Sequence, residues 1–183
     1  MFRPYIVGDV AKKGMILDEH APVISPDTIR LREVIAADLP IFFEHQRDAE
    51  ANVMAAFTAR DPNDWAAFMA HWAKILAEPT VINRTILVAG NVAGNVAKFE
   101  DFGAPEIGYW IGRRYWGQGV ATSALAAFLP QIPVRPVYAH VAQDNRGSIR
   151  VLEKCGFVIC GHDKEFSNAR GSEVEALVLM RDA

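Results

Sequence analysis

"YWIGRRYWGQGVATSAL", residues 109–125, decides the fold, because it joins a strand-like run to a helix-like run through closely spaced glycines. We predict a strand over residues 105–112 and a short helix over residues 120–129. Gly117 and Gly119 lack a Cβ, so a ligand can approach the backbone, and the first N–H groups of the helix lack intrahelical partners. Those groups and the helix dipole favour an anion. Because no Asp or Glu lies in that first turn, the sequence predicts a bound phosphorylated group.

The two glycines also occur in other kinds of site. A dinucleotide site requires a third glycine where Thr122 stands, and an acidic residue about 20 positions further on, which residues 134–143 do not supply. The GxxxxGK[ST] pattern is absent, which removes the main support for nucleotide hydrolysis or kinase chemistry. A plain strand-to-helix turn stays open, because two glycines alone are a weak signal.

The bulk properties indicate an ordinary globular protein. The chain has 183 residues, of which 51% are hydrophobic and 22% charged, which suits one domain. A net charge of -3 and the lack of a basic, aromatic-rich run argue against nucleic acid as a partner. Apolar runs stay below the roughly 18 residues of a membrane span, and the first residues do not resemble a signal peptide. We therefore expect a cytoplasmic protein with no membrane partner.

The spacing of cysteines and histidines gives no sign of a metal site. The only two cysteines, Cys155 and Cys160, do not form a CxxC pair, and the five histidines form no HExxH or HxH cluster. We predict no metal.

The predicted organisation is an irregular N-terminal extension, residues 1–26, followed by one domain, residues 27–183. The domain is α+β, with a mixed, mostly antiparallel central sheet flanked by helices in the order β-α-α-β-β-β-α-β-α-β-β. Asp38 and Asp61 are the expected N-caps of the first two helices, and Gly90-Asn91 is a hairpin turn. Strands are predicted over residues 28–33, 80–89, 92–101, 105–112, 134–143, 157–166 and 173–182, and helices over 36–48, 61–79, 120–129 and 145–154.

A second informative stretch is "QDNRGSIRVLEKCGF", residues 143–157. Asn145 lies at a helix start, and Gly156 with Phe157 fits a left-handed C-terminal cap and its apolar contact. The strand "EIGYWI", the turn "WGQGVA" and "DNRGSIRVLEKCGF", in this order, resemble the GNAT acetyltransferase superfamily. The resemblance is closest to its Rim-type branch, which includes ribosomal-protein N-terminal acetyltransferases, and it runs from Thr28 to the C-terminus.

The resemblance implies acetyl-CoA as co-substrate. The backbone of Tyr109, Trp110 and Ile111 would pair with the pantetheine arm as an added strand does. Asn145 would bond the arm near its thioester. The residues expected to cradle the pyrophosphate are Trp116, Gly117, Gln118, Gly119, Val120 and Ala121.

Which residues form the predicted pyrophosphate-binding motif depends on where the helix begins. Arg114, Gly117 and Gly119 also fit the family pattern Q/R-x-x-G-x-G/A by eye. The expected helix start instead places the motif at residues 116–121, with Trp116 in the Gln/Arg position. For the basic residues nearby, contact with CoA phosphates and exposure to solvent both stay open; these residues are Arg113, Arg114 and Arg150.

The resemblance also implies direct attack by a neutral amine on the thioester. Leu152 stands where many members have a tyrosine that serves as the general acid, so no tyrosine fills that role in this chain. Rim-type relatives place a serine where Ser148 stands, and we predict its hydroxyl near the leaving sulfur; a plain first-turn bond to backbone is the alternative.

Glu106 is the first choice for the general base, with Glu100 and Asp101 behind it, although carboxylates near a loop are usually solvated. His140 is either a proton relay or an ordinary strand histidine.

The acceptor is expected between the first two helices and the last hairpin. Carboxylates there that could attract a cationic amine are Glu44, Asp48, Glu50, Glu173 and Glu175. The predicted function is transfer of an acetyl group from acetyl-CoA to a primary amine, on a protein N-terminus or a small molecule. The alternatives are an aminoglycoside-type or other small-molecule acetyltransferase, a non-catalytic acyl-CoA-binding module, and a domain with no ligand. Many family members are dimers, so a homodimer is one alternative for the assembly.

Overall fold

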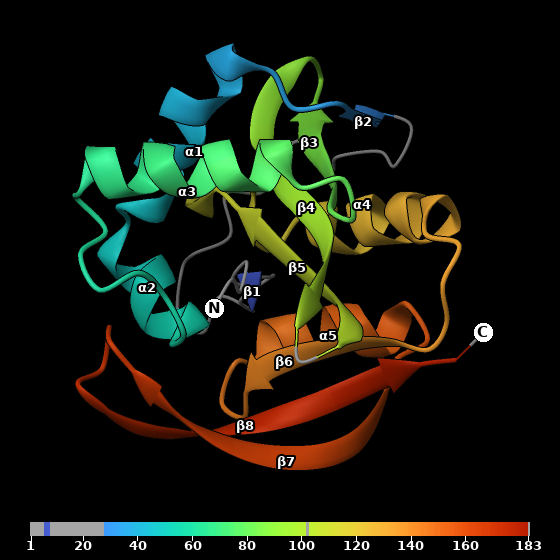
Figure 1. The fold of residues 1–183 in the computed structure, drawn as a ribbon. Helices are drawn as coiled ribbons and strands as arrows, with labels where there is room; N and C mark the ends of the chain where they lie inside the picture. The colour runs from blue at the N-terminus through green and yellow to red at the C-terminus, as the bar shows by residue number, and fades with distance from the viewer. Residues whose placement is uncertain (1–5, 8–27, 102, 183) are drawn as a thin grey trace, which may run out of the picture.

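The structure is a computed structural model that describes residues 6–7, 28–101 and 103–182. Figure 1 shows the arrangement of its helices and strands. The strands are β1 (Ile6–Val7), β2 (Ile29–Arg32), β3 (Ile82–Val88), β4 (Asn91–Asp101), β5 (Ala104–Ile111), β6 (Val137–Ala142), β7 (Val158–Ser167) and β8 (Ser172–Arg181). The helices are α1 (Leu39–Gln46), α2 (Ala49–Ala55), α3 (Trp65–Ala77), α4 (Val120–Phe128) and α5 (Arg146–Lys154), and short 3-10 turns cover 36–38, 113–115 and 129–131.

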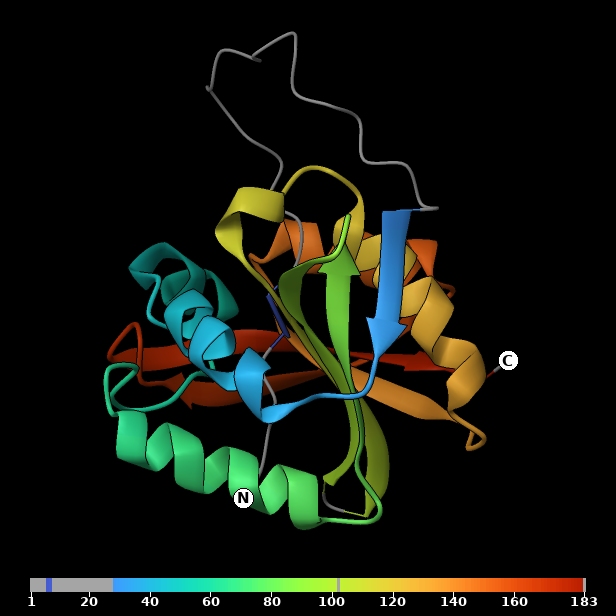
Figure 2. The ribbon, with the colours of Figure 1, turned by 90° about the horizontal axis from the view of Figure 1, so that it is seen from above.

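One mixed sheet forms the centre of the molecule, with strands in the order β2-β3-β4-β5-β6-β8-β7. Neighbours in this order are antiparallel except β5 and β6, which are parallel. Figures 1 and 2 show α1, α2 and α3 on one face of the sheet and α4 and α5 on the other. The predicted α+β fold, with a mostly antiparallel sheet flanked by helices, is confirmed.

Two apolar cores hold the helices against the sheet. The larger contains Leu125 and Phe128 of α4 and Leu152 of α5, all nearly inaccessible to solvent. The smaller lies under α3, where Phe68 and Trp72 pack against α1. Burying one such side chain contributes about 1.5–3 kcal/mol, so these contacts fix the positions of the helices. Trp65 and Leu76 at the ends of α3 are exposed, so the buried face of the helix is confined to its middle turns.

The central strands β5 and β6 diverge from each other. They pair at a single position, Glu106 with Tyr138, whereas the other edge of β5 pairs with β4 from Ala104 to Ile111. Beyond Glu106 the edge of β5 that faces β6 pairs in parallel with β1, which places Ile6 beside Tyr109. The backbone segment predicted to bind pantetheine thus lies at the divergence of two strands.

Three local expectations were wrong or incomplete. The first predicted helix, 36–48, is divided into a 3-10 turn and α1. A further helix, α2, follows it, and Asp48 is its N-cap, with a carboxylate that accepts from Ala51 N at 2.9 Å. The N-cap of α3 is Asp64, which accepts from Ala67 N at 2.9 Å, and not Asp61.

Asp38 precedes α1 as predicted but does not cap it with its side chain. Its carboxylate instead binds the guanidinium of Arg32 at 2.6 Å and the hydroxyl of Thr85 at 2.6 Å, because burial requires a charge partner for it. The predicted irregular extension, residues 1–26, contains β1; the remainder of that prediction lies outside the described residues.

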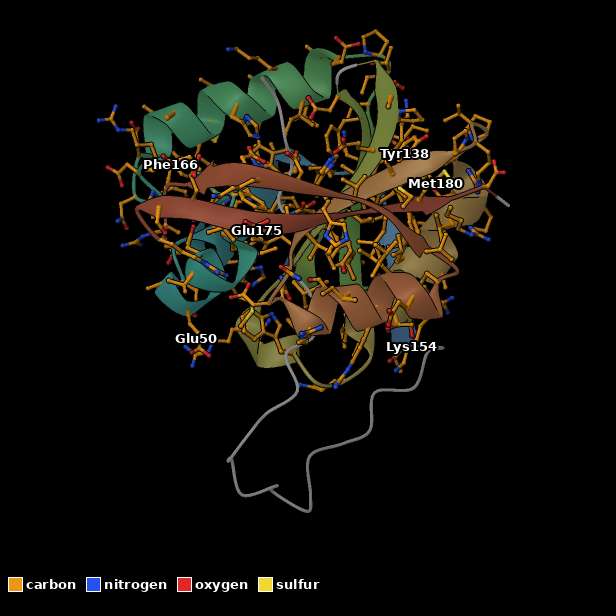
Figure 3. The ribbon with its side chains drawn as sticks, turned by 90° about the horizontal axis from the view of Figure 1, so that it is seen from below. Glu50, Tyr138, Lys154, Phe166, Glu175 and Met180 are labelled. Carbon is orange, nitrogen blue, oxygen red and sulfur yellow. The ribbon has the colours of Figure 1, made fainter. Side chains whose placement is uncertain are left out.

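The hairpin of β7 and β8 closes one end of the molecule, as Figure 3 shows. Its tip is bonded to α2 and the loop that follows. Ser167 Oγ donates to Ala56 O at 2.6 Å, Asn168 Nδ2 to Thr58 O at 3.0 Å, and Arg170 Nε to Val53 O at 2.8 Å. The hairpin and α2 therefore form one unit on the side of the sheet that carries α1 and α3.

Candidate active site

The two faces of β5 lead to different parts of the site. Successive side chains of a strand point to opposite faces, so Glu106 and Trp110 share one face and Tyr109 lies on the other. The indole of Trp110 donates to His45 O of α1 at 3.2 Å, and the hydroxyl of Tyr109 donates to Ser148 O of α5 at 3.4 Å. Glu106 therefore lies on the α1 and α3 face, while Tyr109 lies on the α4 and α5 face.

Glu106 and His140 lie together where β5 and β6 part. His140 Nδ1 is 2.9 Å from Glu106 Oε1, and Glu106 is 4% exposed. The two atoms are in close contact without the alignment of a hydrogen bond, since His140 Nδ1 has no hydrogen-bond partner among the described residues. A buried carboxylate beside an imidazole can take up a proton and pass it on. The structure brings together two residues that the sequence pattern suggested separately.

The other candidate bases are placed less favourably. Glu100 is ion-paired with Lys98, whose side chain is almost fully buried. A carboxylate that neutralises a buried ammonium group is poorly suited to a further proton, because protonation would leave the ammonium unpaired. Asp101, at the end of β4, is buried and also has a partner. Glu106 is therefore the candidate best placed for proton transfer.

The glycine turn between β5 and α4 is open at the positions where a ligand would approach. Gly117 and Gly119 both have φ of 74°, a left-handed conformation that favours glycine, and a Cβ added at either would meet no atom of the described residues within 4 Å. Gly119 is the N-cap of α4, whose first turn contains no acidic residue. The N-terminus of α4 thus offers backbone N–H groups and a positive dipole to an anion.

The side chains around this turn have separate roles. Trp116 is buried and its indole donates to Ile111 O at 2.8 Å, so only its backbone is available to a ligand. Arg113 is paired with Glu50 and lies 3.6 Å from Asp48, both on or beside α2. Arg114 lies over the ring of Tyr115 at 4.6 Å. Arg150 is exposed on α5.

The start of α5 is built around Asn145. Its side chain accepts from Ser148 N at 3.1 Å and donates to Met54 O at 3.3 Å, so it ties α5 to α2. Both Asn145 and Ser148 are fully buried. Leu152, in the position without tyrosine, is buried in the core. The direct role of Asn145 toward a ligand stays a prediction.

The side chain of Tyr109 is a candidate functional group that sequence reasoning missed. Only its backbone was assigned a role, yet its phenol reaches the first turn of α5 at Ser148. The alternation of β5 places it on the face opposite Glu106, which could have been read from the sequence. The Tyr109 hydroxyl therefore lies beside the first turn of α5, the turn that also carries Ser148.

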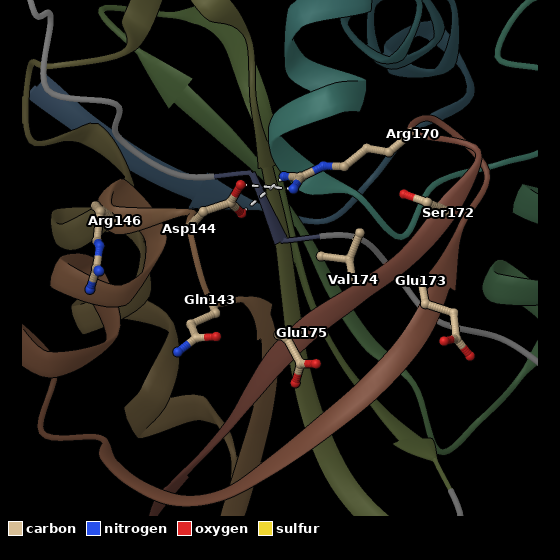
Figure 4. Close-up of a pocket in the computed structure, with 8 residues that line it drawn as sticks. All are labelled: Gln143, Asp144, Arg146, Arg170, Ser172, Glu173, Val174 and Glu175. Carbon is tan, nitrogen blue, oxygen red and sulfur yellow. Dashed lines mark hydrogen bonds and ion pairs between the residues drawn. The ribbon is translucent and has the colours of Figure 1, made fainter.

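The carboxylates predicted to attract the acceptor do not gather in one place. Glu44 binds Arg47 at 3.1 Å, and Glu173 binds Lys164 at 3.1 Å. Asp48 and Glu50 contact Arg113, as described above, whose single positive charge offsets one of their two negative charges. Glu175 lines a groove of about 490 Å³ beside the start of α5 and the last hairpin, where Arg170 binds Asp144 at 2.8 and 3.0 Å (Figure 4).

A second cavity lies on the α1 and α3 face, the face that carries Glu106. It has a volume of about 220 Å³ and is lined by Gln46, Ala59, Asp61, Pro62, Asp64, Ala67, Phe68 and His71. A smaller cavity of about 10 Å³ shares Gln46 and His71 with it and reaches Trp110 of β5. The two cavities therefore adjoin at Gln46 and His71, and the small one lies against the central strand.

The polar groups along these cavities were missed by the sequence analysis. Asn95 Nδ2 and Trp72 Nε1 line the small cavity, are buried, and have no acceptor among the described residues. Burial lowers the pKa of His71, and burial with the nearby charge of Arg114 lowers the pKa of His45 to about 4. Both rings are therefore neutral at pH 7, and Asp61 and Asp64 leave the region negative.

Two further properties of the described residues bear on function. No described helix is long and apolar enough to cross a membrane. Within residues 6–7, 28–101 and 103–182, no group of three or more His, Cys, Asp or Glu side chains is placed to hold a metal ion.

A mixed sheet whose central strands diverge beside a glycine turn and a helix N-terminus defines the GNAT class of fold. Residues 28–158 match the family described as "Acetyltransferase (GNAT) domain". The chain therefore belongs to the GNAT acetyltransferases, a family of acyltransferase enzymes.

Individual relatives agree with this assignment. Over 99 residues the chain is 27% identical to an uncharacterized N-acetyltransferase, p20, of Bacillus licheniformis. This match covers 52% of the chain and 55% of that relative, so the chain matches about half of its length.

Two solved structures are similar in fold. Ribosomal-protein-alanine N-acetyltransferase from Brucella melitensis has a TM-score of 0.71 at 20% identity, over 84% of this chain and 99% of that one. Spermidine N-acetyltransferase from Vibrio cholerae, in complex with CoA and spermine, has a TM-score of 0.68 at 21% identity, over 84% and 96%. At these identities the likeness shows the fold alone.

Proposed function

We propose that this chain transfers an acetyl group from acetyl-CoA to a primary amine, as a Rim-type member of its family. The observation that carries the proposal is the glycine turn, with φ of 74° at Gly117 and Gly119 and open space above both, directly before the N-terminus of α4. A pyrophosphate fits such a site, because backbone N–H groups and the helix dipole both favour it. The solved relative crystallised with CoA and spermine supports the donor class.

In this proposal the donor lies along the divergence of β5 and β6. The backbone of residues 109–111 binds the pantetheine arm as an added strand, and the backbone of residues 116–121 holds the pyrophosphate. Asn145 orients the start of α5 near the thioester. Trp116 contributes through its backbone, since its indole is bonded to Ile111 O.

Acetyl-CoA supplies the acetyl group as a thioester, and the chain supplies the proton transfers. Glu106, with His140 beside it, accepts the proton that the ammonium form of the acceptor must lose before its nitrogen can attack the thioester carbonyl. The carbon–nitrogen bond forms as the carbon–sulfur bond breaks. The nitrogen loses its second proton as the amide forms, and a proton reaches the thiolate through a hydroxyl on the α5 side, which regains its own proton from the one that the nitrogen released. A thiol with a pKa near 8.5 leaves with little help, so one such group suffices.

The hydroxyl that assists the thiolate is tested by comparing Tyr109→Phe with Ser148→Ala. If Ser148 provides it, Ser148→Ala lowers kcat by about tenfold to 100-fold, while Tyr109→Phe, which loses a 3.4 Å bond to a carbonyl, changes kcat less than threefold. Single-turnover rates at saturating acetyl-CoA measure the difference. The reverse order would assign the role to Tyr109, and two unchanged rates would remove the acid from the mechanism.

The acceptor binds, in this proposal, in the cavity of about 220 Å³ on the α1 and α3 face. That cavity lies on the same face of the sheet as Glu106, and Asp61 and Asp64 at its rim attract a cation. Its volume suits a small amine or the first residues of a peptide. The groove beside Glu175 is the competing location.

A pair of charge-removing variants separates the two locations. Asp61→Asn is expected to raise KM for a diamine acceptor about threefold to tenfold with kcat unchanged, because a carboxylate near the ammonium group is lost. Glu175→Gln should leave both constants unchanged. Initial rates over a range of acceptor concentration decide the matter; an effect of Glu175→Gln alone would place the acceptor in the groove near α5.

The activity itself is tested by following CoA release with acetyl-CoA and a panel of diamines, amino acids and short peptides with free N-termini. Release that depends on one acceptor class is expected. The second candidate is a non-catalytic acyl-CoA-binding module. It is favoured by Leu152, which is buried in the position where many relatives have a tyrosine that serves as the general acid. Calorimetric binding of CoA without release for any amine would select that candidate and contradict the first.

A further inference from the structure

The edge of β5 that faces β6 has a partner from the chain itself. A strand has two edges, and β4 pairs with one of them along the whole of β5. Pairing with β6 is limited to Glu106, so β6 does not pair with the second edge beyond that residue. On this edge β1 pairs in parallel, with Ile6 opposite Tyr109 and Val7 opposite Trp110. A two-residue strand therefore fills part of the divergence between β5 and β6 (Figure 1).

The strand β1 pairs with the same backbone segment of β5 that is proposed to bind pantetheine. The backbone segment that contains Tyr109 is the one whose N–H and C=O groups the added-strand arrangement requires, and one strand edge can bind one such partner at a time. The family match begins at residue 28, so Ile6 and Val7 lie outside the matched domain. Both are β-branched residues that favour strands, and β1 also contacts α2.

We propose that the edge of β5 at Tyr109 and Trp110 is a peptide-strand site that the chain's own β1 and the pantetheine arm of acyl-CoA occupy in turn. This inference rests on the proposed function. The β1 strand competes with the donor as an intramolecular ligand, and the donor binds only to the fraction of molecules in which β1 has left the edge. The apparent affinity for CoA is then lower than the intrinsic affinity by that fraction.

The expected size of the effect follows from the short pairing. Two residues contribute few backbone hydrogen bonds, each of modest net value, and the strand is covalently linked to the domain. We therefore expect β1 to weaken CoA binding about fivefold to tenfold. Because the competition is intramolecular, the effect does not change with protein concentration.

The test compares three full-length chains by calorimetric titration with CoA. The double variant Ile6→Pro/Val7→Pro cannot donate backbone hydrogen bonds at these positions, whereas Ile6→Val/Val7→Ile keeps both donors and both β-branched side chains. We expect the proline variant to bind CoA about fivefold to tenfold more tightly than the natural chain, and the control to match the natural chain. Hydrogen exchange without CoA should be faster over residues 107–111 in the proline variant alone.

The outcomes separate this inference from the function on which it rests. Equal affinities and equal exchange in all three chains would overturn the competition while leaving CoA binding intact. Absence of CoA binding in all three would overturn the proposed function, and the competition with it. Tighter binding by both double variants would also overturn it, because the control retains the strand.

Discussion

Replacement of Glu106 by Gln is expected to lower kcat for a primary amine by about 100-fold to 1,000-fold at pH 7, with KM for acetyl-CoA nearly unchanged. Glutamine keeps the size of the side chain and the position on β5, but it cannot accept a proton. An amine acceptor with a pKa near 10 is almost fully protonated at pH 7, so it depends on a base. Rates of CoA release measured from pH 7 to 10 would show the loss.

The pH dependence gives this prediction its sharpest form. The defect of Glu106→Gln should shrink as the pH approaches the pKa of the acceptor, because the amine then loses its proton to solvent. Glu100→Gln is the matched control: Glu100 lies on the neighbouring strand and is already paired with Lys98. A rate for Glu106→Gln within threefold of the natural chain at pH 7 would remove Glu106 from proton transfer.

Replacement of Gly119 by Asp is expected to weaken CoA binding at least about 100-fold while the protein stays folded. Aspartate is favoured at helix N-caps and tolerates the left-handed conformation better than most residues, and space is open above Gly119. Its carboxylate occupies the anion position and repels a phosphate. Two unit charges 4 Å apart at an effective dielectric constant of 20 interact by about 4 kcal/mol, enough for this loss.

Gly171→Asp is the control for this second prediction. Gly171, in the turn of the last hairpin, also has a positive φ, 64°, and a Cβ there would meet no atom within 4 Å. The two variants thus carry the same residue change and a similar backbone conformation, and they differ in their distance from the N-terminus of α4. Calorimetry with CoA and thermal unfolding of both variants measure the contrast. Equal CoA affinities would show that the turn does not bind the pyrophosphate.

Local sequence patterns predicted those parts of the fold that depend on a few neighbouring residues. The glycine turn and the cap of α5 by Asn145 each follow from backbone conformation or helix termini. The β3–β4 hairpin was also predicted, but its two-residue turn is Ala89-Gly90 and not Gly90-Asn91, since Asn91 already pairs with Val88. Asp61 failed as the cap of α3 because Asp64 offers the same chemistry three residues later, and a pattern of several aspartates does not decide between them. The cap of α2, Asp48, was present in the sequence but was taken as part of a longer helix.

Relations between distant residues were beyond the sequence pattern. Glu106 and His140 were each named, but their contact depends on the single pairing of β5 with β6, which no local signal gives. The same applies to Tyr109 and Ser148, and to Asn95 and Trp72 in the small cavity. The strand β1 is too short to show a period, so its place on β5 could not be inferred.

The tip of the last hairpin has a consequence for the order in which the protein is made. Ser167, Asn168 and Arg170 bind backbone carbonyls more than 100 positions earlier in the chain, at Ala56, Thr58 and Val53. Contacts between such distant positions form late, since a long loop must close first. A ribosome-bound chain that lacks the final two strands therefore lacks these three bonds to α2 and the loop after it, and α2 depends on contacts such as those with Asn145 and Arg113. We expect the assembled site to be one of the last features to appear, only after the C-terminal residues have left the ribosome.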